Sequence, residues 1–141
     1  MVLMPKTLTL KAEILVDGDA KGEILKLSAP ISFWGGIDPA AGKIASPTHP
    51  DHGATLTGKV LAIPQIIGSS SSSQLLLELL YRGTAPAAIL LGAFDTIIGI
   101  APLVGREMAF GTLPILHLPL DAIETGMMAS IEPEGRIELS S

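Results

Sequence analysis

Apolar and polar residues alternate through the first part of the chain, which is typical of β-strands with one face in the core. Residues 7–16 follow this pattern, with an apolar side chain at every second position. Shorter strands are predicted at residues 23–27 and 31–34, after a turn-forming cluster of Gly and Asp at residues 17–22. The first part of the chain is therefore expected to be β-structure.

Two continuous apolar runs, residues 58–64 and 86–91, are typical of strands that are buried on both faces. Between them, one glycine and five serines at residues 68–73 precede a leucine-rich run that ends at Gly83. Serine and glycine favour the start of a helix, leucine its interior and glycine its end. Residues 58–91 therefore predict a β-α-β unit with a right-handed crossover.

The remaining elements are expected to be short. A helix is predicted at residues 95–104 and a capped helical turn at residues 121–126. Further strands are expected at residues 114–118 and in a closing hairpin of residues 127–131 and 135–139. We find neither an internal repeat nor a linker. Residues 1–141 are therefore expected to form a single α/β domain that is rich in β-structure (a β-rich α+β fold).

Residues 35–53 form a long segment rich in Gly and Pro, in which only residues 44–45 look extended enough to pair with a strand. Loops of this length inside a compact domain tend to be functional. The glycines before Lys43 superficially resemble a phosphate-binding loop. However, their spacing is wrong, and Ile44 stands where that loop needs Ser or Thr for magnesium. We interpret these glycines as turn residues.

Composition limits the classes of partner. The chain is 48% hydrophobic and only 16% charged, so we expect part of its apolar surface to be buried against another protein. The net charge is −5 without a basic cluster, which disfavours nucleic-acid binding. The sequence has no cysteine, so this chain offers no disulfide, no thiolate nucleophile and no cysteine ligand for a metal or cluster.

One apolar segment is long enough to cross a membrane, because Asp95 is the only charge in residues 83–105. It also contains Pro86 and Pro102, and a carboxylate near the middle of a membrane span is costly. We therefore favour a buried strand followed by a helix, and no membrane association. Charged residues within the first twenty positions argue against a signal peptide, so a cytoplasmic protein is expected.

The sequence His49-Pro50-Asp51-His52 brings two imidazoles and a carboxylate together. A zinc site would need a third and fourth ligand, and only the distant His117 and scattered acidic residues remain. We expect no metal site in this chain and consider His49 a candidate polar contact to a ligand. A Ser-His-Asp hydrolase is disfavoured because the serine run lacks a Gly-x-Ser-x-Gly elbow.

The serine run follows a buried strand and opens an apolar helix, so a low-complexity linker is a poor interpretation. Backbone N–H groups at such a helix start are well placed to hold an anion. A serine there could also act as a base, but the helix dipole stabilises its ionised form by at most about 1–2 kcal/mol. The chain offers no obvious cation to supply the remaining stabilisation of an ionised serine. The sequence thus predicts half of an active site, which a partner completes.

Five short segments occur in an informative order and spacing: Gly35-Gly36-Ile37-Asp38-Pro39, His49-Pro50, Gly53, Gly68-Ser69-Ser70 and Ala85-Pro86-Ala87-Ala88-Ile89. Together they resemble the small, swivelling subunit of the aconitase X family, over residues 22–131. No segment alone would be specific. The resemblance implies a swivelling β/β/α domain that docks on a larger α/β subunit, with the active site between the two parts.

The resemblance also implies a role for the serine loop. The first serine of the Gly-Ser-Ser loop is the base for dehydration in aconitase-type enzymes, and this serine corresponds to Ser69, with Ser70 as its neighbour in the loop. We consider Gly68, Ser70, His49 and Asp38 candidate contacts to the small-molecule substrate. The large subunit would hold an iron–sulfur cluster through its own cysteines, and no cofactor is expected in this chain.

Two activities are implied by the family: dehydration of cis-3-hydroxy-L-proline and of mevalonate 5-phosphate. Loops associated with the second tend to carry a threonine and a further glycine where this chain has Ser70 and Ser72, which favours the first activity. A non-catalytic swivel that holds an anion at residues 68–73 is an alternative, and a phosphohistidine carrier ranks last. We expect Trp34 and residues 35–53 to lie near the large subunit, and the isolated chain to self-associate.

Overall fold

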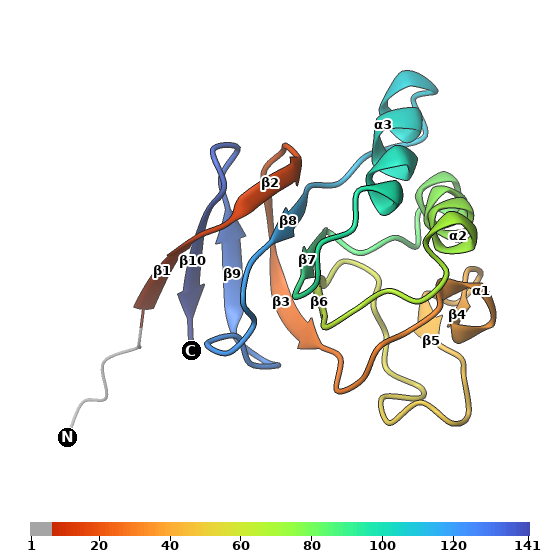
Figure 1. Ribbon diagram of the computed structural model, residues 1–141, viewed down its shortest axis with the longest axis horizontal. Helices are drawn as coiled ribbons and strands as arrows, with labels where there is room; N and C mark the ends of the chain where they lie inside the picture. The colour runs from red at the N-terminus through yellow and green to blue at the C-terminus, as the bar shows by residue number, and fades with distance from the viewer. Residues whose placement is uncertain (1–6) are drawn as a thin grey trace.

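The computed structural model describes residues 7–141, which form two layers of β-structure covered on one side by helices (Figure 1). The strands are β1 (Thr7–Lys11), β2 (Glu13–Val16), β3 (Ala20–Lys26), β4 (Ile37–Asp38), β5 (Lys43–Ile44), β6 (Val60–Ile63), β7 (Ala88–Leu91), β8 (Ile115–His117), β9 (Met128–Ile131) and β10 (Arg136–Ser140). The helices are α1 (Phe33–Gly36), α2 (Ser69–Arg82), the 3-10 helix η1 (Ile97–Gly99) and α3 (Ile100–Glu107).

Within the described residues, eight strands form one sheet in the order β1-β10-β9-β3-β6-β7-β8-β2. The four strands β3, β6, β7 and β8 are mutually parallel, and the strands on either side of them pair antiparallel. The β4–β5 hairpin is separate from this sheet. The β-α-β prediction for residues 58–91 is confirmed, because β6 and β7 pair in parallel with α2 between them in the chain.

The two ends of this strand order are joined by the chain itself. β1 pairs with β10 at one end and β2 pairs with β8 at the other, yet only Ala12 separates β1 from β2. The buried Ala12 donates its N–H to the Gly135 carbonyl oxygen at 2.9 Å. The sheet therefore curls until its edges meet at this segment. The strand predicted at residues 7–16 is extended, as expected, but it changes partner in the middle.

The two faces of β6 and β7 lie in different cores. The side chains that point into the curled sheet are Val60, Ala62, Ala88 and Leu90. Those that point toward the helices are Leu61, Ile63, Ile89 and Leu91. All eight are fully buried. A strand with both faces buried has no polar alternation, which explains the continuous apolar runs in the sequence.

α2 packs on the core that faces the helices through four buried leucines, Leu75, Leu76, Leu79 and Leu80. The helix ends as predicted at Gly83, which has a φ of 75° and donates its N–H to the Leu80 carbonyl oxygen at 3.2 Å. None of the helices in residues 7–141 combines the length and the apolarity that a membrane span requires.

Some local predictions are wrong. Residues 31–34, predicted as a strand, contribute only a bridge from Ile31 to Ile66 before α1 begins. The reason is that the Phe33 N–H donates to the buried Ser72 hydroxyl at 3.1 Å instead of to a neighbouring strand. The predicted loop at residues 35–53 contains the β4–β5 hairpin, and residues 121–126 form turns without a helix.

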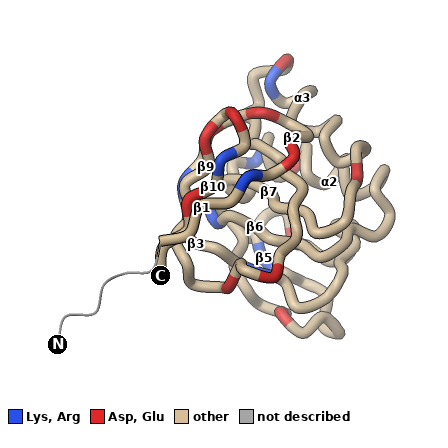
Figure 2. Tube along the Cα trace, turned by 60° about the vertical axis from the view of Figure 1, so that its left-hand side comes forward, with Lys and Arg blue, Asp and Glu red and all other residues tan. Residues whose placement is uncertain are grey.

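Charged residues are unevenly distributed over the fold. They gather along β1, β2, β9 and β10, whereas the part of the chain around α2 is largely uncharged (Figure 2). On the β9–β10 hairpin, Arg136 donates to Glu132 at 2.6 Å, and this hydrogen bond holds the pKa of the Glu132 carboxyl below its usual value. The helical side of the domain is therefore the apolar side.

We expect Gly42→Ala to destabilise the domain more than Gly53→Ala. Both glycines have a positive φ, 65° and 88°, so each alanine enters the left-handed region at about 1–2 kcal/mol. A Cβ at position 42 would also collide with the Thr57 hydroxyl, whereas position 53 has no atom within 4 Å. Chemical denaturation should show a further loss of about 1–3 kcal/mol for Gly42→Ala. Equal losses in both variants would contradict this packing.

Candidate active site

The ends of two neighbouring strands bring distant segments together. β6 and β7 run in parallel side by side, and each is followed by a loop and then by a helix. The carboxyl ends of parallel strands lie at one edge of a sheet, where α/β proteins usually bind their ligands. Ser69, the first residue of α2, follows β6, and Asp95 follows β7 just before η1.

Ser69 and Asp95 are in direct contact at this edge. The half-buried Ser69 hydroxyl donates to Oδ2 of Asp95. Oδ1 of Asp95 accepts the Ile97 N–H at 2.9 Å and the Ile98 N–H at 3.3 Å. The backbone thus fixes one carboxylate oxygen and the serine contacts the other. This geometry directs the Ser69 proton toward Asp95 and leaves the lone pairs of the serine oxygen for another group.

Ser72 attaches the serine run to α1. Its side chain is fully buried, and its hydroxyl donates to the Ile67 carbonyl oxygen at 3.3 Å while accepting the Phe33 N–H. The residues next to Phe33 are therefore held beside the start of α2. One of them, Trp34, leaves 65% of its surface exposed, which is unusual for a tryptophan in a small domain.

Gly68 and Ser70 flank Ser69 in different ways. Gly68 precedes α2 with a φ of 68°, a conformation that favours glycine, and a Cβ there would lie 3.2 Å from the Ser71 hydroxyl oxygen. Ser70 is exposed and lines an apolar hollow of about 210 Å³ between α2 and the η1–α3 segment, together with Ile97 and Ile100. Both residues are therefore near the Ser69 hydroxyl and accessible to a ligand or partner.

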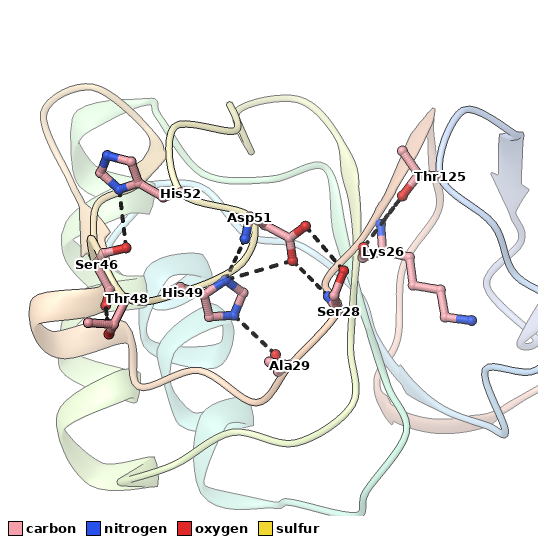
Figure 3. A network of polar contacts seen from close by, with 9 residues as sticks. All are labelled: Lys26, Ser28, Ala29, Ser46, Thr48, His49, Asp51, His52 and Thr125. Atoms are coloured by element: carbon pink, nitrogen blue, oxygen red, sulfur yellow. Dashed lines mark hydrogen bonds and ion pairs between the residues drawn. The ribbon is translucent and has the colours of Figure 1, made fainter.

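His49 uses both ring nitrogens within the protein (Figure 3). Nε2 lies 3.2 Å from the Ala29 carbonyl oxygen, and Nδ1 accepts the Asp51 N–H at 3.0 Å. These partners require the neutral ring with its proton on Nε2. The Asp51 carboxylate in turn accepts the Ser28 N–H at 2.7 Å. With only 6% of its side chain exposed, His49 joins two loops, and a ligand could bind the ring only by replacing one of these hydrogen bonds.

An open pocket of about 470 Å³ lies beside α1, between parts of residues 29–36 and 46–50. Trp34 and the hydroxyl-bearing residues Ser32 and Thr48 contribute to its wall. A Cβ on Gly68 would lie 3.8 Å from the Ser32 hydroxyl oxygen, so this pocket adjoins the serine loop. It is the larger of the two hollows beside the start of α2.

Asp38 lies near the other end of α2. Its carboxylate accepts the N–H groups of Ala40 and Ala41 at 3.0 and 3.4 Å, which is a turn-stabilising arrangement. The adjacent Pro39 carbonyl oxygen accepts the hydroxyl of Thr84, beyond the C-terminal end of α2, at 2.6 Å. A helix of 14 residues is about 21 Å long. The structure therefore does not bring Asp38 together with Ser69.

The site has no positive charge of its own in the described part of the chain. Neither hollow beside α2 is lined by Lys or Arg. Residues 7–141 also contain no group of three or more His, Cys, Asp or Glu side chains that could hold a metal ion, and the sequence has no cysteine. The residues present do not fit an iron–sulfur cluster. What they offer is hydrogen bonding between the Ser69 hydroxyl, the Asp95 carboxylate and two backbone N–H groups.

Asp95 is the site residue that the sequence analysis missed, since it was considered only as a charge in an apolar segment. A signal for it exists in the sequence. Asp95 follows a buried apolar strand, just as the serine run follows another. Two adjacent parallel strands would place both at one edge, but that adjacency depends on the strand order, which the sequence pattern does not specify.

The fold is that of a swivel domain of the aconitase type. Residues 9–139 match a family that is described as the aconitase X swivel domain. The chain therefore belongs to the aconitase X swivel domain family, as its motifs predicted. The structure is similar to the crystal structure of Thermococcus kodakaraensis aconitase X in its holo form, with a TM-score of 0.84 and 28% identity. That match covers 94% of this chain and 98% of the other.

Relatives in this family carry two different names. A cis-3-hydroxy-L-proline dehydratase from Pseudomonas aeruginosa is 41% identical over 127 residues, which are 89% of this chain but 22% of that protein. A phosphomevalonate dehydratase small subunit from Methanopyrus kandleri is 33% identical over 128 residues, 88% of this chain and 90% of that one. The chain thus spans 22% of the first relative and nearly the whole of the second.

We expect His49→Ala to lower the free energy of unfolding by about 1–3 kcal/mol, because it leaves the Asp51 N–H and the Ala29 carbonyl without their buried partner. His52→Ala is the matched control. That side chain is exposed and has one ring contact, to the Ser46 carbonyl oxygen at 3.1 Å, so its removal should change stability by less than about 0.5 kcal/mol. Similar values for the two variants in urea denaturation would refute the joining role of His49.

Proposed function

We propose that this chain is the swivelling subunit of a two-part aconitase X hydro-lyase, in which Ser69 is the general base that removes a proton from a small hydroxylated carboxylic acid. Family membership and the dehydratase names of the relatives support the reaction class. The observation that carries the proposal is the position of Ser69. It opens α2 at the edge of the sheet and is hydrogen-bonded to a carboxylate, with two hollows nearby.

The second half of the site would come from a large subunit. Elimination of water needs a group that stabilises the departing hydroxide, and the described residues beside Ser69 include neither a cation nor a metal site. In this proposal an iron–sulfur cluster in the large subunit supplies that Lewis acid. The pair would work in the cytoplasm on a soluble metabolite.

Cis-3-hydroxy-L-proline is our preferred substrate, and mevalonate 5-phosphate is the alternative. A phosphate monoester is usually bound by Arg or Lys side chains, and neither hollow beside Ser69 has one. The 41% identity to the hydroxyproline dehydratase points in the same direction. An assay of the co-expressed subunits on both compounds distinguishes them, and binding of an anion without turnover would indicate a non-catalytic swivel.

The surface around Ser69 has the character of an interface. Large apolar side chains of α1, η1, α3 and the residues next to Gly68 and Asp95 leave 36–65% of their area exposed: Trp34, Ile67, Phe94, Ile97, Ile100, Leu103 and Val104. The neighbouring chain carries few charges (Figure 2). An exposed apolar cluster of this kind is typical of a protein contact. We propose that the large subunit covers this cluster, which we call the apolar face, and thereby encloses Ser69.

Ser69→Ala should lower kcat of the reconstituted complex by at least about 10²-fold, the usual contribution of a positioned base. The variant should still bind the large subunit, because Ser69 contributes only a hydroxyl at the edge of the apolar face. Ser71→Ala is a suitable control, since its hydroxyl contacts only the Gly68 carbonyl oxygen at 3.0 Å among the contacts described. A near-normal turnover of Ser69→Ala would overturn the proposed role.

Ile100→Asp should weaken binding to the large subunit by at least about tenfold, because it introduces a charge into the apolar face, in the wall of the hollow that Ser70 also lines. Ile100 is 54% exposed, so the melting temperature of the isolated domain should not change. Met128→Asp on β9 is the matched control, at a residue that is 50% exposed on the opposite, charged side. Isothermal titration calorimetry of the three proteins would refute this interface if both variants bound equally.

A further inference from the structure

We propose that Asp95 is a positioning residue that accepts the Ser69 proton while Ser69 removes a proton from the substrate. This inference rests on the proposed function. In the step, the substrate C–H bond breaks and an O–H bond forms at Ser69, whose own proton moves to Oδ2 of Asp95. The C–H electrons form the C=C bond, and the hydroxyl on the neighbouring carbon leaves as hydroxide with the C–O electron pair, which a group of the large subunit would stabilise.

The geometry favours Asp95 as a fixed acceptor. Its Oδ1 is held by the N–H groups of Ile97 and Ile98, at 2.9 and 3.3 Å, so the carboxylate cannot rotate away without losing both bonds. Its Oδ2 already accepts a hydrogen bond from the Ser69 hydroxyl. No movement of either side chain is needed for the proton to cross this hydrogen bond.

Electrostatics argue against the alternative, a free alkoxide at Ser69. The Asp95 carboxylate disfavours an alkoxide at Ser69, because two negative charges would then be in contact. The hollows around the serine loop contain no Lys or Arg in the described part of the chain that could offset this repulsion. A neutral serine that passes its proton to Asp95 avoids the second negative charge. Asp95 is therefore better suited to accept the Ser69 proton than to stabilise an alkoxide. We call this transfer, from Ser69 to Asp95 as Ser69 takes the substrate proton, the relay.

Asp95→Asn separates this role from a structural one. Asparagine is an equally good helix-capping residue, so its Oδ1 should still accept the two N–H groups, but its amide cannot take up a proton. Asp95→Ala removes both functions. In the reconstituted complex we expect Asp95→Asn to lower kcat by about 10²-fold or more with little change in KM. The melting temperature should fall for Asp95→Ala but stay near that of the unsubstituted protein for Asp95→Asn.

Glu132→Gln is the matched control for the loss of a carboxylate. Glu132 accepts a hydrogen bond from Arg136 at 2.6 Å on the β9–β10 hairpin, far from the helices (Figure 1), and its substitution should leave kcat unchanged. The double variant Ser69→Ala/Asp95→Asn, measured in single turnover, should be no slower than Ser69→Ala alone. Residues that act as one unit are not additive, whereas a separate structural effect would add its own loss.

The results also distinguish this inference from the proposed function. Loss of turnover in Ser69→Ala together with near-normal kcat in Asp95→Asn would overturn the relay alone. A slow Asp95→Asn whose melting temperature falls as far as that of Asp95→Ala would assign Asp95 a structural role and also overturn the relay. Near-normal turnover in Ser69→Ala would overturn the proposed base, and the relay with it.

Discussion

The burial of β6 and β7 on both faces is the constraint on which the rest of the domain depends. One face fills the curled sheet and the other supports α2 and η1–α3, so neither strand can shift register without exposing apolar side chains on one side and crowding them on the other. This rigidity fixes where each strand ends. The residues that follow, Ser69 and Asp95, are therefore held at one edge although they are distant in sequence.

The surroundings of the Ser69–Asp95 pair carry little charge. Both hollows beside α2 are neutral or apolar, and the charges of the domain lie mainly on the opposite side (Figure 2). A partner that covers the apolar face would exclude water from the Ser69–Asp95 pair and strengthen its electrostatics, because charges interact more strongly at low dielectric. In the function proposed above, the domain would contribute the proton acceptor and the partner the electrophile.

Features that depend on local sequence could be predicted, and those that depend on closure of the sheet could not. The serines at the start of α2 and Gly83 at its end follow from the preferences of neighbouring residues. The change of partner at Ala12 depends on where β8 and β10 lie, so a period-two pattern cannot reveal it. Phe33 was placed in a strand because its hydrogen bond to Ser72, 39 residues away, has no signature in the sequence. The contact between Ser69 and Asp95 was missed for a similar reason, because it requires that β6 and β7 be neighbours.

The segment through Ala12 has a consequence for the free domain. A sheet with exposed edge strands can add further strands from other molecules and grow into ordered aggregates. Here β1 and β2 occupy both ends of the strand order and belong to one short piece of chain, so the sheet largely closes on itself. If the apolar face docks a partner as proposed, copies of the free domain are expected to associate through side chains of that face rather than through strand edges. Closure of the sheet thus allows an exposed apolar face without exposed strand edges that could seed fibres.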